Sequence, residues 1–122
     1  MMMTQEQAFL KSRQQLQTLH AYVEEASSQG ERIDKVEREL FSQLLLIGHT
    51  LLEGFVAAQG VGDEGPALQQ EERTLQRSEE VQERRYLSIF GELLIARYVY
   101  AAGEKQKTAA PLDARLSSPA DE

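Results

Sequence analysis

The sequence contains no cysteine and no tryptophan, and it has only three prolines and two histidines in 122 residues. Without cysteine, the chain cannot form a disulfide scaffold, a thiolate zinc site or a cysteine nucleophile. The same absence leaves the redox compartment open.

Positive charge is also scarce. The chain has 13 Lys and Arg against 20 Asp and Glu, which gives a net charge of -7, and the acidic excess is spread over both halves. A field of this sign repels phosphate, so it argues against strong non-specific nucleic-acid binding by this chain alone.

Long hydrophobic runs are missing as well. The all-aliphatic run from Leu44 to Ile47 is far shorter than a membrane span. Met1 to Thr4 lead directly into polar, helix-forming sequence without the apolar stretch of a signal peptide. We therefore expect a soluble cytoplasmic protein with no membrane partner.

Hydrophobic periodicity predicts two helices in the first half. In the first, apolar residues recur at steps of three, four and seven, and Gly30 is expected to cap the helix in the left-handed conformation. The second, over residues 31–58, has a wider stripe that suggests burial on more than one side. Gly48 and Gly54 inside it indicate a close helix crossing or a mild kink. The first stripe consists of Phe9, Leu16, Leu19 and Val23. The second consists of Ile33, Val36, Leu40, Leu44, Ile47, Leu51 and Phe55, widened by Phe41, Leu45, Leu52 and Val56.

The short connection at Gly30 favours an antiparallel helical hairpin over residues 1–60. Two helices make a thin core, and both stripes resemble a coiled-coil seam, so we also expect a homodimer through the helices. The glycine-rich residues 60–66 end the second helix. We interpret them as a flexible loop and not as a phosphate cradle, because no strand precedes them and no helix start clearly follows.

The second half is expected to contain a linker and a small β-hairpin. Residues 61–83 form the linker, of which 67–83 are charged and poorly periodic and are either linker or weak helix. Alternating apolar residues predict two strands joined by a turn at Gly91 and Glu92. A polar loop over residues 101–110 then leads to a Pro-Leu-Asp-Ala-Arg-Leu segment, and residues 117–122 are expected to be a disordered tail. The predicted fold class is α+β: a long helical hairpin, a linker and a C-terminal β-hairpin.

Four stretches in this order resemble the N-terminal region of ISKra-family insertion-sequence transposases. They are the end of the second helix (Leu-Leu-Glu-Gly-Phe-Val-Ala-Ala-Gln-Gly, 51–60) and the glycine loop Val-Gly-Asp-Glu-Gly-Pro (61–66). The others are the strand-turn-strand Arg-Arg-Tyr-Leu-Ser-Ile-Phe-Gly-Glu-Leu (84–93), and Gln-Lys (106–107) leading to Pro-Leu-Asp-Ala-Arg-Leu (111–116). The similarity covers roughly residues 31–119. One departure is that Ser118 precedes Pro119, where the family usually has an apolar residue.

The resemblance implies a mobile-element protein of DNA transposition and recombination. Such transposases resemble the wider group in which an RNase-H-like domain holds two magnesium ions on three carboxylates. In the family this domain follows the Pro-Leu-Asp segment, so residues 84–116 would be the joint to a catalytic domain that this chain lacks. No acidic residue here matches a catalytic carboxylate. We therefore expect a truncated, non-enzymatic fragment without a cofactor of its own, derived from a decayed gene or a deliberate fragment.

The sequence has one basic cluster, which is the candidate DNA-contacting site. It consists of Arg84, Arg85, Arg97, Lys105 and Lys107, followed by Arg115 and interleaved with Tyr86, Tyr98 and Tyr100. A β-ribbon with arginines and aromatic residues can contact a DNA backbone or groove, and a transposase must find the ends of its element. The alternative is a solvated strand face, because Glu79, Glu80, Glu83 and Glu92 largely cancel the charge.

Two further interpretations stay open. His49 and Glu53 stand four residues apart on one helix face, but a zinc site needs at least three protein ligands. We therefore favour a partly exposed histidine beside a helical carboxylate. The alternative function for the whole chain is a stand-alone helical interaction protein that pairs with an intact transposase and inhibits it.

Overall fold

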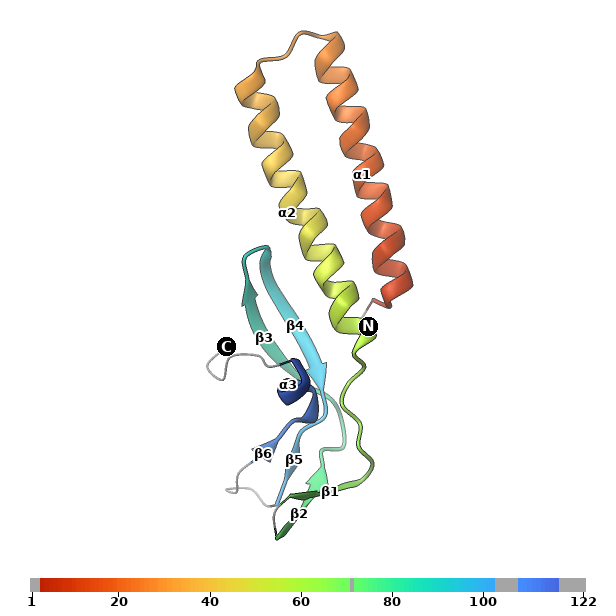
Figure 1. Ribbon diagram of the computed structural model, residues 1–122, viewed down its shortest axis with the longest axis vertical. Helices are drawn as coiled ribbons and strands as arrows, with labels where there is room; N and C mark the ends of the chain where they lie inside the picture. Colours follow the sequence, from red (N-terminus) through yellow and green to blue (C-terminus); the bar gives the residue numbers. More distant parts are fainter. Residues whose placement is uncertain (1–2, 71, 103–107, 117–122) are drawn as a thin grey trace. The chain divides into compact units, whose positions relative to one another are not determined.

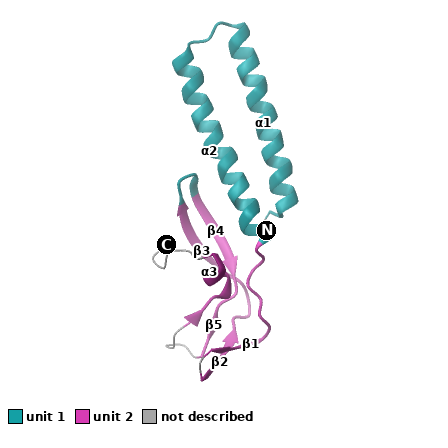
Figure 2. Cartoon of the chain, in the orientation of Figure 1, with its two compact units in different colours: residues 1–58, 88–91 teal, residues 59–87, 92–122 magenta. Residues whose placement is uncertain are grey.

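A computed structural model describes residues 3–70, 72–102 and 108–116 (Figure 1). The chain divides into two compact units, drawn in different colours in Figure 2. Unit 1 contains residues 1–58 and the short segment 88–91. Unit 2 contains residues 59–87 and 92–122. The α+β class is confirmed: two long helices precede a region of small antiparallel sheets.

Helix α1 (Gln5–Ser28) has well-defined ends. Thr4 caps its start in a capping box, in which the Thr4 hydroxyl accepts a hydrogen bond from the Gln7 N–H and the Gln7 side chain accepts one from the Thr4 N–H. At the other end Gly30 adopts a φ of 64°, as predicted. The Glu31 N–H donates to the Ala26 carbonyl at 3.0 Å, which closes the helix end in a Schellman motif.

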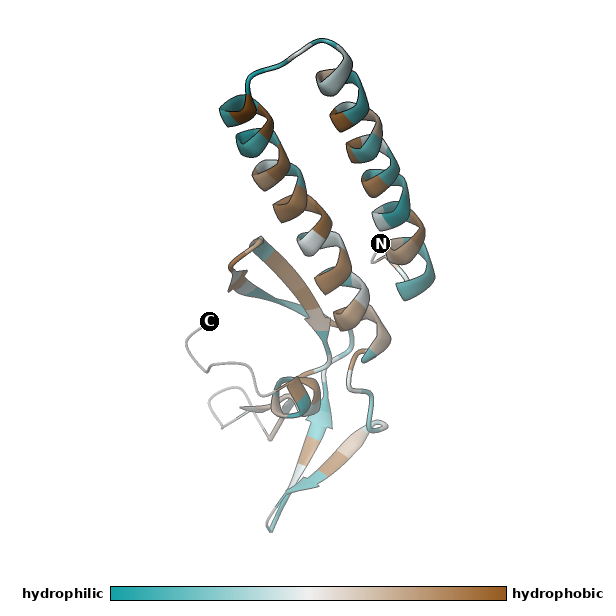
Figure 3. Cartoon of the chain, turned by 45° about the horizontal axis from the view of Figure 1, so that its top comes forward, coloured by the Kyte–Doolittle hydropathy of each residue, from teal (hydrophilic) through white to brown (hydrophobic). Residues whose placement is uncertain are grey.

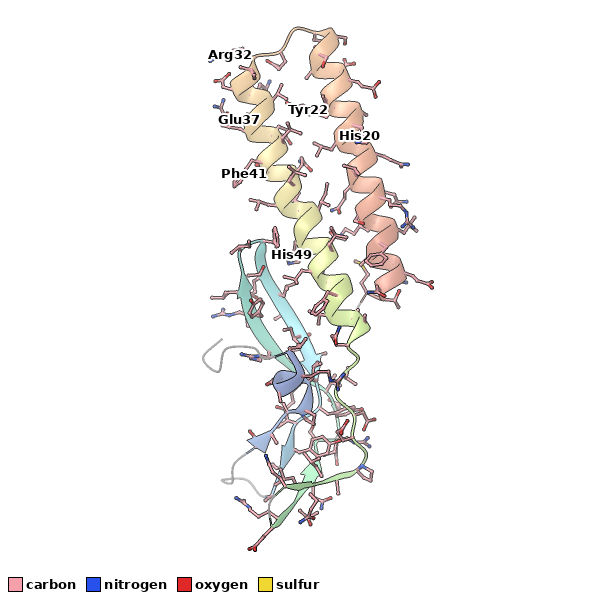
Figure 4. All side chains as sticks on the ribbon, viewed as in Figure 1. His20, Tyr22, Arg32, Glu37, Phe41 and His49 are labelled. Carbon is pink, nitrogen blue, oxygen red and sulfur yellow. The ribbon has the colours of Figure 1, made fainter. Side chains whose placement is uncertain are left out.

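Helix α2 (Ile33–Ala58) runs antiparallel to α1 in unit 1. In each helix one row of buried and half-buried residues recurs at alternating steps of three and four, the spacing of a coiled-coil seam. In α1 this row is Ala8, Ser12, Gln15, Leu19, Tyr22 and Ala26. In α2 it is Val36, Leu40, Gln43, Ile47, Thr50 and Gly54, and α2 is also half-buried or buried outside this row, at Leu45, Leu52 and Val56. We call these two rows the seam; Tyr22 is seen between the helices in Figure 4.

Both helical glycines permit a close approach. A Cβ on Gly54 would lie 3.0 Å from the Cβ of Ala8, so α1 and α2 come together there, as expected from the sequence. A Cβ on Gly48 would lie 2.5 Å from the ring of Phe90, which belongs to the segment 88–91 of unit 1. Gly48 therefore provides a notch for an aromatic ring.

The expectation of linker or weak helix over residues 67–83 is wrong for most of that stretch. Strands β1 (Ala67–Gln70) and β2 (Arg73–Arg77) form an antiparallel pair in which Leu68 is opposite Leu75. Leu75 is 3 % exposed. Alternation was hard to see because these strands are short and mostly polar, and one buried leucine is too little to produce a period.

The predicted β-hairpin is present as β3 (Gln82–Ser88) and β4 (Gly91–Arg97), which form a two-stranded sheet. Its turn lies at Ile89 and Phe90, two residues before the position we predicted. Gly91 begins β4 with a φ of 119°, so the glycine marks the strand start and not the centre of the turn. Leu93 and Ile95 are buried on one face of β4.

The expected polar loop over residues 101–110 is bounded by strands. Strand β5 (Tyr100–Ala101) pairs with both β2 and β6 (Thr108–Ala109), which gives a four-stranded antiparallel sheet in the order β1-β2-β5-β6. The Pro-Leu-Asp-Ala-Arg-Leu segment forms a short helix, α3 (Pro111–Leu116), with proline in the first turn. The predicted tail over residues 117–122 lies outside the described residues.

Candidate functional site

The basic cluster predicted to contact DNA lies in unit 2, and most of its described members bind groups of the same unit. The Nε atom of Arg97 donates to Asp113 at 3.2 Å, and its Nη1 atom donates to the Gln82 carbonyl at 2.9 Å. Arg84 lies 3.8 Å from the same Asp113 carboxylate. The side chains of Arg84 and Arg97 are only 9 % and 15 % exposed. The two arginines therefore hold α3 against the β3–β4 sheet through Asp113.

The remaining basic residues differ in exposure. Arg115 donates to the Gln59 carbonyl at 2.7 Å, which joins α3 to the chain just after α2. Arg85 is 3.6 Å from Glu92 and 65 % exposed. Lys105 and Lys107 lie outside the described residues. Among the described arginines of the predicted cluster, Arg85 and Arg115 are exposed, and Arg115 is bound to the Gln59 carbonyl.

The tyrosines of the cluster serve the interior of unit 2 as well. Tyr100 is fully buried, and its hydroxyl donates to the Gly65 carbonyl at 2.6 Å and accepts from the Glu64 N–H at 2.9 Å. The guanidinium of Arg77 lies 4.9 Å from the centre of the Tyr98 ring. Such a distance is typical of a cation–π contact.

The glycine loop is packed and is not merely a helix stop. Gly62 is buried, and its φ of 68° is in the left-handed region. A Cβ at this position would lie 2.8 Å from the backbone nitrogen of Leu112 in α3. The Val61 carbonyl accepts a hydrogen bond from the Tyr98 N–H at 2.9 Å. The loop, β4 and α3 therefore form one contact region.

Asp63 in this loop has a lowered pKa. The Gly65 N–H donates to its carboxylate at 2.9 Å and the Arg77 guanidinium donates at 2.7 Å, and both bonds favour the charged form. The same contact raises the pKa of Arg77. The pair fastens the loop to strand β2.

His49 and Glu53 are close enough to interact but form no larger cluster. The Nδ1 atom of His49 is 3.5 Å from the Glu53 carboxylate, and both side chains are partly exposed. Among the residues that the structure describes, no three His, Cys, Asp or Glu side chains are grouped as a metal site. The geometry therefore fits the histidine–carboxylate pair that we favoured from the sequence.

Unit 1 exposes a set of large apolar side chains on its two helices. Most of the predicted α2 stripe, eight of its eleven residues, is not in the seam. On both helices, exposed apolar residues stand one position after seam residues in the sequence. Helix α2 carries two phenylalanines beside these residues. We call these residues the apolar face. They are Phe9 and Leu16 of α1, and Phe41, Leu44, Leu51 and Phe55 of α2, with exposed fractions of 40, 43, 66, 52, 44 and 52 %.

The apolar face lies on one side of the helical hairpin. Phe9 and Leu16 come one position after the seam residues Ala8 and Gln15, and Leu44 comes one position after Gln43. Because the helices are antiparallel, rows that follow the seam in this way lie on the same side of both helices. Phe41 stands three residues before Leu44, so it extends the same surface away from α1, as Figure 4 shows.

The composition of α2 is reflected in Figure 3, where hydrophobic residues occupy much of its length. Within the described residues α2 is the single helix long and apolar enough to cross a membrane by length and composition, although only 17 % of its most apolar window is buried. Uninterrupted apolar runs do not reveal this property, because polar residues interrupt the apolar positions of α2. Helices in the cores of soluble proteins pass the same test, so it does not assign α2 to a membrane.

Comparison with protein-family models, with curated proteins and with solved structures finds no match for this chain.

The sequence reasoning missed two features of these sites. It gave Asp113 no role, although an acidic residue in a segment that follows an arginine-rich hairpin is a candidate ion-pair partner. It also did not separate, within the apolar stripes, the residues of the seam from those that stay exposed. The signal that distinguishes the seam from the apolar face is the small or polar character of the seam residues Ala8, Ser12 and Thr50, which permits close helix packing.

Proposed function

We propose that this chain is the N-terminal, non-catalytic region of an ISKra-type transposase, in which the helical hairpin mediates subunit association. The observation that carries the association role is the apolar face. Six large apolar side chains, each at least 40 % exposed, line one side of two packed helices. Exposed apolar patches of this kind mark interaction surfaces in soluble proteins.

The proposed ancestry rests on the four resembling stretches, and their contacts support treating them as one functional unit. The glycine loop meets α3 at Gly62 and Leu112. The β3–β4 sheet meets α3 through Arg97 and Asp113. Arg115 reaches back to Gln59. Unit 2 would then be a folded connection to the magnesium-dependent domain that the family implies. The whole protein would act in the cytoplasm.

A domain exchange tests this proposal. The 122 residues would replace the corresponding N-terminal region of an intact ISKra-type transposase, and excision of a marked element would be counted in cells. We expect the chimera to retain transposition, whereas a matched chimera with an unrelated helical hairpin should not. A soluble, well-expressed chimera without activity would contradict the proposed ancestry.

Contact with transposon-end DNA is the finer part of the proposal, and Arg85 is its best described candidate. Replacing Arg85 with Glu should weaken a gel shift of end DNA and reduce its dependence on salt, because each lost phosphate contact lowers the salt slope by about one. Glu92→Gln, which removes the partner of Arg85 without adding negative charge, is the control and should not weaken binding. Equal binding by Arg85→Glu and the unchanged chain would remove this residue from the interface.

The second candidate is an inhibitor that pairs with an intact transposase. The helical location of the apolar face favours it, because mixed complexes need only the helices. Co-expression of this chain with an intact relative should then lower transposition, and the same chain with Leu44→Glu should not. Undiminished transposition at high expression of the chain would contradict inhibition.

A further inference from the structure

We propose that the turn Ser88–Gly91 is a latch that covers the middle of the apolar face on α2, and that its release uncovers this face. The proposal rests on the proposed association role and adds how access to the associating surface is controlled. By its contacts the turn belongs to unit 1 and has the colour of the helices in Figure 2, although most of strands β3 and β4 belongs to unit 2. A short segment from the second half of the chain is therefore seated on α2.

The latch makes its contact through one ring in one notch. A Cβ on Gly48 would lie 2.5 Å from two ring atoms of Phe90, so the ring occupies the space where any other residue has a side chain. The three atoms nearest to that Cβ all belong to this ring. Beside it, a Cβ on Gly91 would lie 3.7 Å from the His49 ring, an ordinary van der Waals distance. A methyl group at position 48 would therefore push the ring out before it meets the backbone of the turn.

The turn is held together from within. The Ser88 hydroxyl accepts a hydrogen bond from the Phe90 N–H at 3.0 Å and donates one to the Gly91 carbonyl at 2.6 Å. Ile89, at the tip, is 87 % exposed. The two hydrogen bonds do not involve α2, so the turn keeps its shape whether the ring is docked or released. Release is then a movement of a preformed turn and does not require a strand to unfold.

The notch lies in the middle of the α2 part of the apolar face. Leu44, Gly48 and Leu51 stand at positions i, i+4 and i+7, so they follow one another along one side of the helix. The two leucines remain exposed on either side of the ring. A partner helix packs its side chains against consecutive turns of such a row. With Phe90 over the middle turn the row is interrupted, and a partner meets the ring instead of α2.

The strength of the contact suits a latch that opens while the helices stay folded. Phe90 is only half-buried when it is docked. Its release exposes less apolar surface than the loss of a core side chain, so the hydrophobic effect that holds it is smaller. Gly48 lies inside α2, where glycine is less favourable than alanine because it loses more backbone freedom on folding. The docked ring offsets this weakness of the helix.

Dye binding tests whether the latch covers the face. Phe90→Ala empties the notch, Ile89→Ala shortens the exposed neighbour in the same turn, and neither changes the charge of the chain. Fluorescence of anilinonaphthalene sulfonate reports exposed apolar surface. We expect it to rise severalfold for Phe90→Ala and not to rise for Ile89→Ala, while both variants keep the helical circular dichroism signal. An unchanged dye signal for Phe90→Ala, an equal rise for both variants, or a rise accompanied by loss of helix would overturn the latch.

Gly48→Ala approaches the same contact from the helix. Where the notch is already empty, alanine favours the helix, so Gly48→Ala should raise the helical melting temperature of Phe90→Ala by roughly 5 °C. In the unchanged chain the methyl group displaces the ring, so the gain should be smaller or absent and the dye signal should rise. Gly54→Ala, whose Cβ would meet Ala8, is the control and should act equally in both backgrounds. Equal effects of Gly48→Ala with and without Phe90 would contradict the docked ring.

Both measurements are made on the isolated chain and require no partner. A failed domain exchange therefore leaves the dye result standing, and an overturned latch leaves the proposed association role standing. Failures of the two proposals are distinguishable for this reason.

Discussion

Replacing Asp113 with Ala should destabilise unit 2 and leave unit 1 nearly unchanged. The Asp113 carboxylate lies between the guanidinium groups of Arg84 and Arg97, whose side chains are 9 and 15 % exposed. Without it, two largely buried positive charges lose their shared partner. Breaking a fully buried ion pair costs about 3–5 kcal/mol. Asp113 itself is 29 % exposed and its distance to Arg84 is long, at 3.8 Å, so we expect about 2 kcal/mol, below the fully buried range.

The two units can be followed separately in the same unfolding experiment. Three of the four tyrosines, Tyr86, Tyr98 and Tyr100, lie in unit 2. Tyrosine fluorescence therefore reports mainly on unit 2, and the far-ultraviolet helical signal reports on unit 1. A loss of about 2 kcal/mol should lower the tyrosine midpoint by about 10 °C in a unit of this size. Asp113→Asn keeps the side-chain size and should lose less than Asp113→Ala.

An exposed ion pair of the same unit is the control for this experiment. The Asp63–Arg77 pair is short, at 2.7 Å, but its side chains are 45 and 31 % exposed. Solvent screens such a pair, so Asp63→Ala should shift the tyrosine midpoint much less than Asp113→Ala. If Asp113→Ala changes the free energy of unfolding of unit 2, followed by tyrosine fluorescence, by less than about 0.5 kcal/mol, the carboxylate does not hold α3 in place.

Three further predictions concern single positions. Gly62→Ala should destabilise unit 2 by about 2 kcal/mol, since a side chain is strained at φ 68° and its Cβ would meet the Leu112 backbone; an unchanged tyrosine midpoint would contradict this packing. Tyr22→Phe should leave the helical melting temperature unchanged or raise the stability by up to about 1 kcal/mol, because within the described residues the buried hydroxyl has no hydrogen-bond partner; a clear loss of stability would contradict that reading. Asp63→Asn should flatten the acid side of the stability–pH curve. The lowered pKa of Asp63 contributes stability above the ordinary value of 3.8 that is lost as the pH falls through the lower folded-state value, so an identical acid limb would contradict it.

The helical half of the fold could be predicted because its signals are local. The capping residues and the hydrophobic period each involve residues that are close in sequence, and Gly30 ends α1 as expected. What the period did not reveal is which side of α2 meets α1. Leu44 and Ile47 belong to one predicted stripe, but Ile47 lies in the seam and Leu44 is exposed. Hydrophobicity alone does not distinguish these sides, because close packing selects small residues such as Gly54 for the seam.

The sheet half depended on contacts between distant residues and was harder to predict. The strands of the four-stranded sheet are two to five residues long, so alternation had too few positions to be recognised. The roles of Arg84 and Arg97 depend on Asp113, which is 29 and 16 residues further along the chain. A sequence scan sees clustered arginines and predicts an anion partner. The structure supplies that partner from the chain itself.

The most direct test of the apolar face measures its accessibility at one residue. The chain has no native cysteine, so Leu44→Cys and Leu46→Cys each introduce a single thiol on α2. The rate of maleimide labelling would be measured for both variants as the protein concentration rises. We expect labelling at position 44 to slow severalfold with concentration and labelling at position 46 not to change. Equal, concentration-independent rates at the two positions would contradict it.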